Sequence, residues 1–203
     1  GVGKTTLAQS IAARTSLYGA KVLCIDLDQQ SNLTQSFGMQ DIKKPNIYEI
    51  LSNDYDIKES IINVCEGVDL IKSALSNAKL DQFLFTESID VSLLFGHLLD
   101  SIRDQYDYII FDCPPTLGQS VKAAILYSDT VMLPVNPDLF SVEGLKICVD
   151  EVKKMVNSSN KTIDIKIIIN KFDNRTILSN EITQYLFESE YFNELVMPTV
   201  INT

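Results

Sequence analysis

The first six residues of the chain have the types and the order that bind the phosphates of a nucleotide. Glycines let backbone N–H groups approach phosphate oxygens, and a helix that begins near Lys4 adds the positive end of its dipole. Lys4 can reach the β and γ phosphates, and the Thr5 hydroxyl can hold Mg²⁺. We interpret this segment as the second half of a phosphate-binding loop; the alternative is a chance Gly-Lys-Thr at a helix start. The predicted cofactor-binding residues in it are Gly1, Val2, Gly3, Lys4, Thr5 and Thr6.

Asp112 is the first of two further groups that suit a nucleotide site. It ends the apolar run 108–111 and precedes the stiff turn Cys113-Pro114-Pro115. A carboxylate at the carboxyl end of a buried strand can bind Mg²⁺, usually through water, and ligands of open α/β sheets bind at that edge. The alternative is an aspartate that only begins a turn.

Asp26 and Asp28 form the second group, at the end of another apolar run and ahead of the polar residues 29–32. A carboxylate on a movable loop can orient water in line with a γ phosphate, and Asp28 is the candidate for this catalytic role. The residues alone favour a strand-end turn with an N-cap for the next helix.

Short apolar runs rich in β-branched residues alternate with helical stretches along the chain. The predicted strands are 22–27, 108–112, 130–135 and 165–170, with weaker ones at 68–71 and from 195; the predicted helices are 5–18, 92–103, 119–127, 141–155 and 178–187. Such alternation predicts an α/β fold with a doubly wound, mostly parallel sheet. Together with the phosphate-binding motif of residues 1–6, it indicates a sheet of P-loop NTPase type. Residues 37–85 are less regular, and nothing marks a domain boundary, so we expect one domain over 1–203.

The composition excludes several classes of protein. Hydrophobic residues make up 45% and charged residues 22% of the 203 residues, which excludes a disordered chain. The net charge of −10 excludes a uniformly basic nucleic-acid binder, although a local basic patch is compatible with it. Four scattered cysteines match neither a metal motif nor a disulfide framework, so we expect reduced, buried thiols. With no apolar stretch of membrane-spanning length and no leader pattern, we expect a cytoplasmic protein.

Together these segments resemble the ParA/MinD family of deviant Walker ATPases, and more closely its ParA/Soj partition branch. Residues 1–6 are similar to the end of the family's Lys-Gly-Gly-Val-Gly-Lys-Thr-Thr loop, residues 26–32 to its Asp-x-Asp-Pro-Gln-Gly-Asn segment and residues 108–115 to its Tyr-x-Ile-x-Asp-x-Pro-Pro segment. Later similarities are Pro134-Val135, residues 140–145 and residues 170–176. The resemblance covers essentially the entire chain.

The resemblance implies an ATPase with ATP and Mg²⁺ as cofactors. Lys4 would be the phosphate lysine, Thr5 and Asp112 the metal residues, Asp28 the residue that positions the attacking water, and Asn170 the reader of adenine. It also implies an ATP-dependent homodimer, nonspecific binding to double-stranded DNA, a ParB-like activating protein, no membrane partner, and a place on the nucleoid. The function would be plasmid or chromosome partition.

Differences from the family pattern keep other functions open. We expect a fragment truncated at both ends, because the signature lysine and first strand would precede Gly1 and the family continues beyond Thr203. Gln29 and Ser31 replace the usual Pro and Gly of the second segment, which weakly permits a nucleotide-dependent scaffold without turnover. A MinD-like or other regulatory ATPase, acting at a membrane or protein complex, is the remaining alternative.

Overall fold

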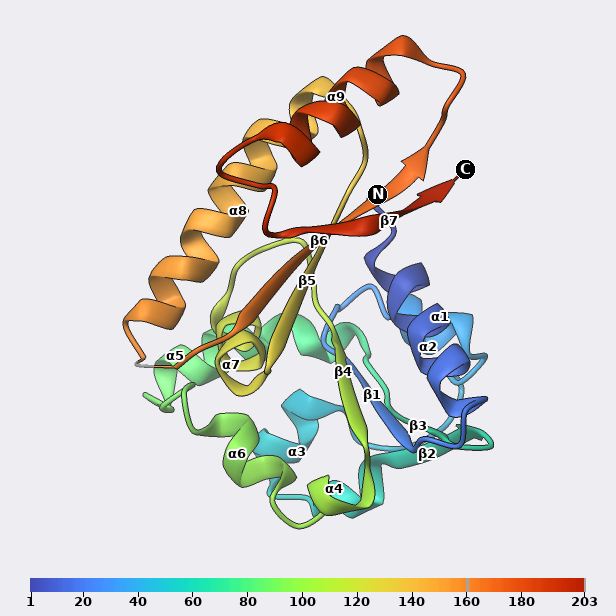
Figure 1. Cartoon of the computed structure of the whole chain (residues 1–203). Coiled ribbons are helices and arrows are strands. Elements are labelled where there is room, and N and C mark those ends of the chain that lie inside the picture. Colours follow the sequence, from blue (N-terminus) through green and yellow to red (C-terminus); the bar gives the residue numbers. More distant parts are fainter. Residues whose placement is uncertain (160, 203) are drawn as a thin grey trace. The chain divides into compact units, whose positions relative to one another are not determined.

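The computed structural model describes residues 1–159 and 161–202, and it has the α/β architecture that the sequence predicts (Figure 1). The chain divides into two compact units. The larger unit contains Thr5–Tyr127, and the smaller unit contains Gly1–Lys4 together with Ser128–Thr203. A single domain over 1–203 stays a prediction.

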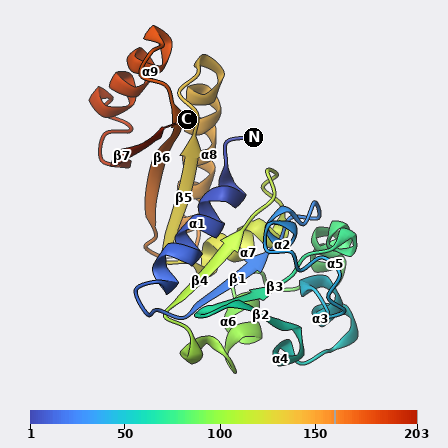
Figure 2. The ribbon, with the colours of Figure 1, turned by 90° about the vertical axis from the view of Figure 1, so that its right-hand side faces the viewer.

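The sheet of the larger unit has four strands in the order β2-β3-β1-β4 (Figure 2). Their bounds are β1 Val22–Asp26, β2 Ile61–Cys65, β3 Val68–Ile71 and β4 Tyr108–Asp112. The central strand β1 is parallel to both β3 and β4, whereas β2 is antiparallel to β3 and forms a hairpin with it. Because the parallel strands run the same way, the carboxyl ends of β1, β3 and β4 meet at one edge of this sheet.

Both faces of β1 are buried, and the two faces belong to different hydrophobic clusters. Leu23 and Ile25 pack with residues from α3, α5, α6 and α7, whereas Val22 and Cys24 pack with residues from α1 and α2. This alternation has the period of two residues that a strand requires. The helices of this unit are α1 Lys4–Ser16, α2 Asn32–Ser36, α3 Ile47–Asn53, α4 Ile57–Ser60, α5 Leu80–Thr86, α6 Leu94–Leu99 and α7 Gln119–Tyr127, with 3-10 turns η1 Leu75–Lys79 and η2 Arg103–Gln105.

The smaller unit has a fully parallel sheet in the order β5-β6-β7, and two helices pack on it (Figure 1). The elements are β5 Thr130–Val135, α8 Leu139–Asn157, β6 Asp164–Phe172, α9 Ile177–Glu188 and β7 Val196–Asn202. Ile167 and Ile169 of β6 lie fully buried in the core, against Val149 of α8 and Leu186 of α9. Asn170 follows this buried run, one residue past the end of the pairing between β5 and β6 and two residues before the end of β6.

Most elements confirm the sequence prediction. β4, β5 and α7 have the predicted bounds, but strand β2 was not predicted, and the expected helix 92–103 is reduced to α6. The first helix ends two residues earlier than predicted, at Ser16, and Leu17 beyond it is 76% exposed. The side chain of Phe140 falls outside the described residues. No helix within the described part is long and apolar enough to cross a membrane.

The prediction of four buried thiols is wrong for Cys65. This residue lies exposed on the edge strand β2, whereas Cys24 is fully buried in β1 and Cys113 and Cys148 are half-buried. Burial raises the pKa of the Cys24 thiol to about 12, and the charge of Asp112 adds to the increase. Since the thiolate is the reactive form, these two cysteines should differ in reactivity.

We therefore expect Cys65 to react with a maleimide at neutral pH in the folded chain, and Cys24 to react only after unfolding. Peptide mass spectrometry after a short labelling pulse gives the measurement, with the urea-unfolded chain as the control. Equal labelling of both residues in the folded chain would contradict the burial of β1.

Candidate active site

The residues predicted to form a site fall into two groups, one in each unit. The larger unit contains Thr5 and Thr6 in the first turn of α1, together with Asp28 and Asp112. The smaller unit contains residues 1–4 and Asn170. We describe each group in turn.

Asp26 and Asp112 are paired across the neighbouring parallel strands β1 and β4. Both lie at the carboxyl ends of their strands and are buried, with 0% and 2% of their surface exposed. The backbone pairing continues for one more residue, because Leu27 N donates to the carbonyl of Asp112 at 2.9 Å. The structure therefore brings two acidic residues together at the edge where α/β sheets bind ligands.

The carboxylate of Asp26 is held by hydrogen bonds from the segment that follows β1. Its Oδ2 accepts from the backbone N–H of Thr34 at 2.9 Å and from the Thr34 hydroxyl at 2.7 Å, and its Oδ1 accepts from Asp28 N at 3.2 Å. Burial raises the pKa of Asp26 to about 6, and these hydrogen bonds, which favour the carboxylate, limit the increase. The negative charge of Asp112 raises this pKa further.

A polar network connects Asp26 to the segment after β3. The backbone N–H of Ser73 donates to Thr34 Oγ1 at 2.9 Å, and Asn77 Nδ2 donates to Ser73 Oγ at 2.8 Å and to the Asp26 carbonyl at 3.4 Å. Thr34, Ser73 and Asn77 are all buried. These three residues were not predicted, because each lies among other polar residues in the sequence and no local pattern marks it as buried.

Asp28 lies in a tight turn between β1 and α2. Its Oδ1 accepts from Gln30 N at 2.9 Å, and its carbonyl accepts from Ser31 N at 2.8 Å. Within the described residues, Oδ2 of Asp28 makes no hydrogen bond. Ser31 has a φ of 54°, in the left-handed region that favours glycine. The predicted strand-end turn is therefore present, but the N-cap residue of α2, Ser31, makes no side-chain bond to the helix. The turn leaves one oxygen of the Asp28 carboxylate for a ligand.

In the smaller unit, the side chain of Asn170 bonds the beginning of the chain. Its Nδ2 donates to the Val2 carbonyl at 2.8 Å, and the neighbouring Lys171 Nζ donates to the Gly1 carbonyl at 2.9 Å. The structure thus brings Asn170 together with the first two residues of the predicted phosphate-binding loop. Whether Asn170 also reads a base stays a prediction.

Asn136 is a second asparagine at this edge that the sequence analysis missed. It follows Val135, which pairs with Ile169, the residue before Asn170. Its Oδ1 is buried and has no hydrogen-bond partner among the described residues. A buried acceptor without a partner is unfavourable unless a ligand or water donates to it.

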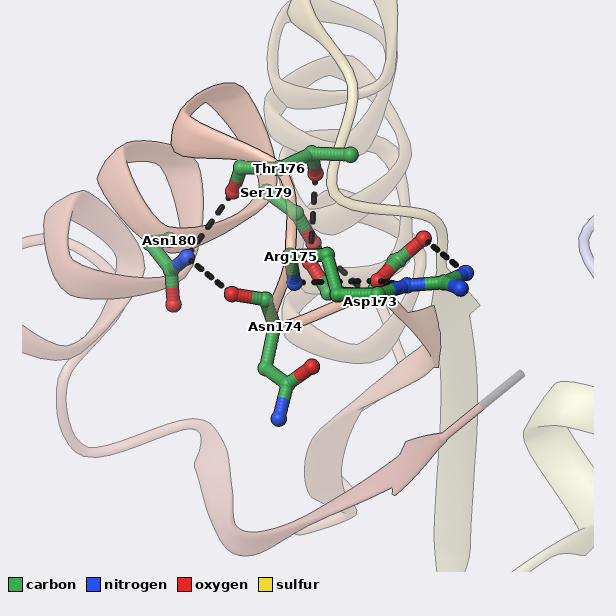
Figure 3. A network of polar contacts seen from close by, with 6 residues as sticks. All are labelled: Asp173, Asn174, Arg175, Thr176, Ser179 and Asn180. Atoms are coloured by element: carbon green, nitrogen blue, oxygen red, sulfur yellow. Dashed lines mark hydrogen bonds and ion pairs between the residues drawn. The ribbon is translucent and has the colours of Figure 1, made fainter.

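The segment after β6 is ordered by its own polar contacts (Figure 3). Arg175 forms a two-pronged ion pair with Asp173, through Nε at 2.9 Å and a terminal nitrogen at 2.8 Å, and this pairing holds the pKa of Asp173 at about 2. Ser179 Oγ accepts from Asp173 N at 3.2 Å, and Asn180 donates to the carbonyls of Asn174 and Thr176. These bonds fix the turn between Asn170 and α9.

The donor atoms at the edge of the larger unit suit Mg²⁺. Carboxylate and hydroxyl oxygens are the ligands that this ion prefers, and its protein sites use one or two carboxylates and complete the shell with phosphates and water. Accordingly, no group of three or more His, Cys, Asp or Glu residues within 1–159 and 161–202 forms a complete metal site. The mutual repulsion of Asp26 and Asp112 would be relieved by a cation at this edge.

A predicted phosphate-binding loop that leads into α1, with aspartates at the carboxyl ends of adjacent parallel strands, is the arrangement of a P-loop NTPase. The family model described as "AAA domain" matches residues 1–165. The sporulation initiation inhibitor protein Soj of Bacillus subtilis is 32% identical over 206 residues, which cover 99% of this chain and 79% of that protein. The chromosome-partitioning ATPase Soj of Treponema pallidum is 29% identical, with 99% and 78% covered.

Solved structures of similar fold include another partition protein. The chain is similar to a putative plasmid partition protein from Borrelia burgdorferi bound to AMPPNP, with a TM-score of 0.81, 30% identity, and 100% and 82% of the two chains covered. Cobyrinic acid a,c-diamide synthase from Mycobacterium smegmatis, with a bound ATP analogue and magnesium, has the same fold at a TM-score of 0.88 and 24% identity, with 100% and 83% covered. The chain belongs to the AAA domain family, and within it to the ParA/Soj-type partition ATPases.

Replacing Thr34 by Val should destabilise the chain by about 2 kcal/mol, because it removes a bond to a buried carboxylate and leaves Ser73 N without its acceptor. Thr34→Ser retains the hydroxyl and should cost about half as much, through the lost methyl group. Urea unfolding followed by circular dichroism measures the difference. Equal stability of the two variants would show that the hydroxyl contributes nothing.

At Ser31, we expect the order of stability Gly, then Ser, then Val. Glycine adopts the left-handed conformation without strain, while its greater freedom in the unfolded chain offsets part of the gain, so Ser31→Gly should change stability by less than about 1 kcal/mol. A β-branched residue at positive φ should cost more than about 1 kcal/mol. Thermal unfolding of the three proteins tests this order, and a Val variant as stable as the wild type would contradict the assigned conformation.

Proposed function

We propose that this chain binds ATP with Mg²⁺, hydrolyses it, and acts as a molecular switch in plasmid or chromosome partition. The pairing of Asp26 with Asp112 at the carboxyl ends of β1 and β4 carries the proposal, because it puts oxygen ligands at the edge of a sheet whose chain begins with a phosphate-binding loop. The names of the relatives and the nucleotides in the related structures support it.

Each residue of the proposed site has a defined role. Lys4 would neutralise charge on the β and γ phosphates, and the N–H groups of residues 1–6 would bind phosphate oxygens. Thr5 and Asp112 would hold Mg²⁺, with Asp112 acting through water. When bound, the ion supplies positive charge that offsets the charge of the phosphates.

Asp28 would position the water that attacks the γ phosphate. Its Oδ1 is engaged by Gln30 N, which fixes the orientation of the carboxylate, and Oδ2 can accept a hydrogen bond from water. A carboxylate in this position aligns the water and accepts its proton as the bond to phosphorus forms. Because Asp28 is 8% exposed, the water would be largely shielded from bulk solvent.

The proposed output is an ATP-dependent homodimer that binds double-stranded DNA nonspecifically and responds to a ParB-like activating protein. Its support is the family membership and the partition proteins among the relatives. We further propose that residues 1–203 act as one ATPase domain in the cytoplasm, associated with the nucleoid. The net charge of −10 means that DNA binding would require a local basic surface.

Hydrolysis should require both Lys4 and Asp28, in different ways. We expect Asp28→Ala to lower kcat by on the order of 100-fold or more while ATP still binds, and Lys4→Ala to lose ATP binding. Phosphate release with and without double-stranded DNA, together with ATP titrations, measures both effects. Asp41→Ala, which removes an exposed carboxylate from the turn after α2, is the matched control.

The outcomes separate the candidate functions. Turnover that DNA stimulates and that both substitutions abolish supports a partition ATPase. If ATP binds but neither DNA nor Asp28→Ala changes turnover, the partition role and the role of Asp28 are both wrong. ATP binding without turnover in the wild type would favour the scaffold that Gln29 and Ser31 permit.

A further inference from the structure

Two adjacent side chains of β6 bond two consecutive carbonyls of the phosphate-binding loop. Asn170 Nδ2 donates to Val2 O at 2.8 Å, and Lys171 Nζ donates to Gly1 O at 2.9 Å. All four residues belong to the smaller unit. We call Asn170 and Lys171 the loop clamp.

The conformation of Lys171 explains how neighbouring side chains can reach the same loop. In a regular strand, successive side chains point to opposite faces of the sheet. Lys171 has a φ of 55°, and the pairing of β6 with β7 shifts register between Ile169 and Phe172. Such an irregularity redirects a side chain, at the energetic cost of a left-handed lysine. The strained backbone is thus associated with a specific contact to the loop.

Gly3 gives a second, independent observation of close fit. Its φ is 91°, and a Cβ atom at this position would lie 2.4 Å from Asn170 Nδ2. Any side chain at Gly3 would therefore displace the amide of Asn170 from the loop. The small size of Gly3 thus leaves room for the Asn170 amide, although the two residues lie 167 positions apart in the sequence.

Holding the carbonyls determines the direction of the N–H groups. In a trans peptide unit, the C=O bond and the following N–H bond point in opposite directions. Bonds from Asn170 to Val2 O and from Lys171 to Gly1 O therefore turn the N–H groups of Gly3 and Val2 away from the clamp. Two N–H groups turned to one side form the kind of concave site that binds an anion.

We infer that Asn170 and Lys171 are positioning residues that preorganise the phosphate-binding loop for the triphosphate, independently of the base. This inference rests on the proposed function, since it takes residues 1–4 to bind phosphate. It adds a role for Asn170 beyond the reading of adenine that the family resemblance implies, and it assigns a role to Lys171. The amide nitrogen of Asn170 serves the loop, and its oxygen is not used in that bond.

Inorganic tripolyphosphate separates loop positioning from base reading, because it carries the phosphates without a base. Asn170→Leu removes the donor while it keeps the branched skeleton and the neutral charge of the side chain, and Asn174→Leu, at an exposed position in the next turn, is the matched control. Calorimetric titrations with tripolyphosphate and with ATP, each with Mg²⁺, are compared for the wild type and both variants.

We expect Asn170→Leu to weaken tripolyphosphate and ATP binding by a similar factor, on the order of tenfold, and Asn174→Leu to change neither. A loss for ATP alone would mean that Asn170 only reads the base, which overturns the inference. Unchanged binding of both ligands overturns it as well. If the wild type binds neither ligand, the proposed function itself fails, and the inference fails with it.

Backbone NMR relaxation of the ligand-free chain provides a test that does not depend on binding. We expect Asn170→Leu and Lys171→Met each to lower the order parameters of the N–H groups in residues 2–4, while those in α9 stay as in the wild type. Lys166→Met, which removes a lysine earlier in β6 that pairs with Asp164, is the control for the lost charge. Unchanged order parameters of residues 2–4 in both clamp variants would overturn the inference, and lower order parameters throughout the unit would mean that the substitutions only weaken the fold.

Discussion

A carboxylate removed from water needs hydrogen-bond donors, and Asp26 obtains them from the loop that follows it. Its three donors come from Asp28 and Thr34, which lie two and eight residues further along the chain. To supply them, the chain must turn back immediately after β1 and begin α2 close to the strand end. The position of Asp28 is a consequence of that turn.

The hydrogen bonds around Asp26 also involve the segment that follows the neighbouring strand β3. Thr34 is fixed on one side by Asp26, and its hydroxyl oxygen accepts from the segment after β3 on the other. Asn77 then returns to the carbonyl of Asp26. A movement of the Asp28 loop would break bonds in all three segments, so the network favours a small number of discrete arrangements over gradual deformation. This behaviour suits a protein that changes state with its nucleotide.

In the smaller unit, the loop at the beginning of the chain is also held by side-chain hydrogen bonds, but here the loop supplies the acceptors. There the groups that need partners are carbonyls, and Asn170 and Lys171 supply the donors. In both units, satisfying polar groups at a strand end also fixes the conformation of a neighbouring loop. The stability of the strand end and the geometry of the site therefore depend on the same hydrogen bonds.

The elements that depend on local pattern could be predicted from the sequence, and those that depend on distant partners could not. β4 and β5 are short apolar runs with clear turns after them, and α7 has a regular helical pattern, so their bounds were predicted correctly. β2 was not predicted because Asn63 interrupts its short apolar run, and the strand is stabilised by its hairpin with β3 rather than by burial on both faces.

The site residues also divide into those that a local pattern indicates and those that depend on distant partners. Asp112 is recognisable because it directly ends its strand. Asn77 contacts Asp26 across 51 positions and Asn170 contacts Val2 across 168, so no local pattern contains either bond. The family resemblance implies that Asn170 reads adenine. Its bond to Val2 could be found only from the structure.

Ser31 shows how a departure from the family pattern can leave the site intact. The family's glycine at this position suits a left-handed residue, and Ser31 adopts that conformation with a φ of 54°. It is retained because both ends of the loop are fixed, by Asp28 bonding Gln30 on one side and by Thr34 bonding Asp26 on the other. The substitution therefore changes the strain in the loop more than its path. Since the path sets the direction of the Asp28 carboxylate, the replacement of this glycine is no argument against hydrolysis.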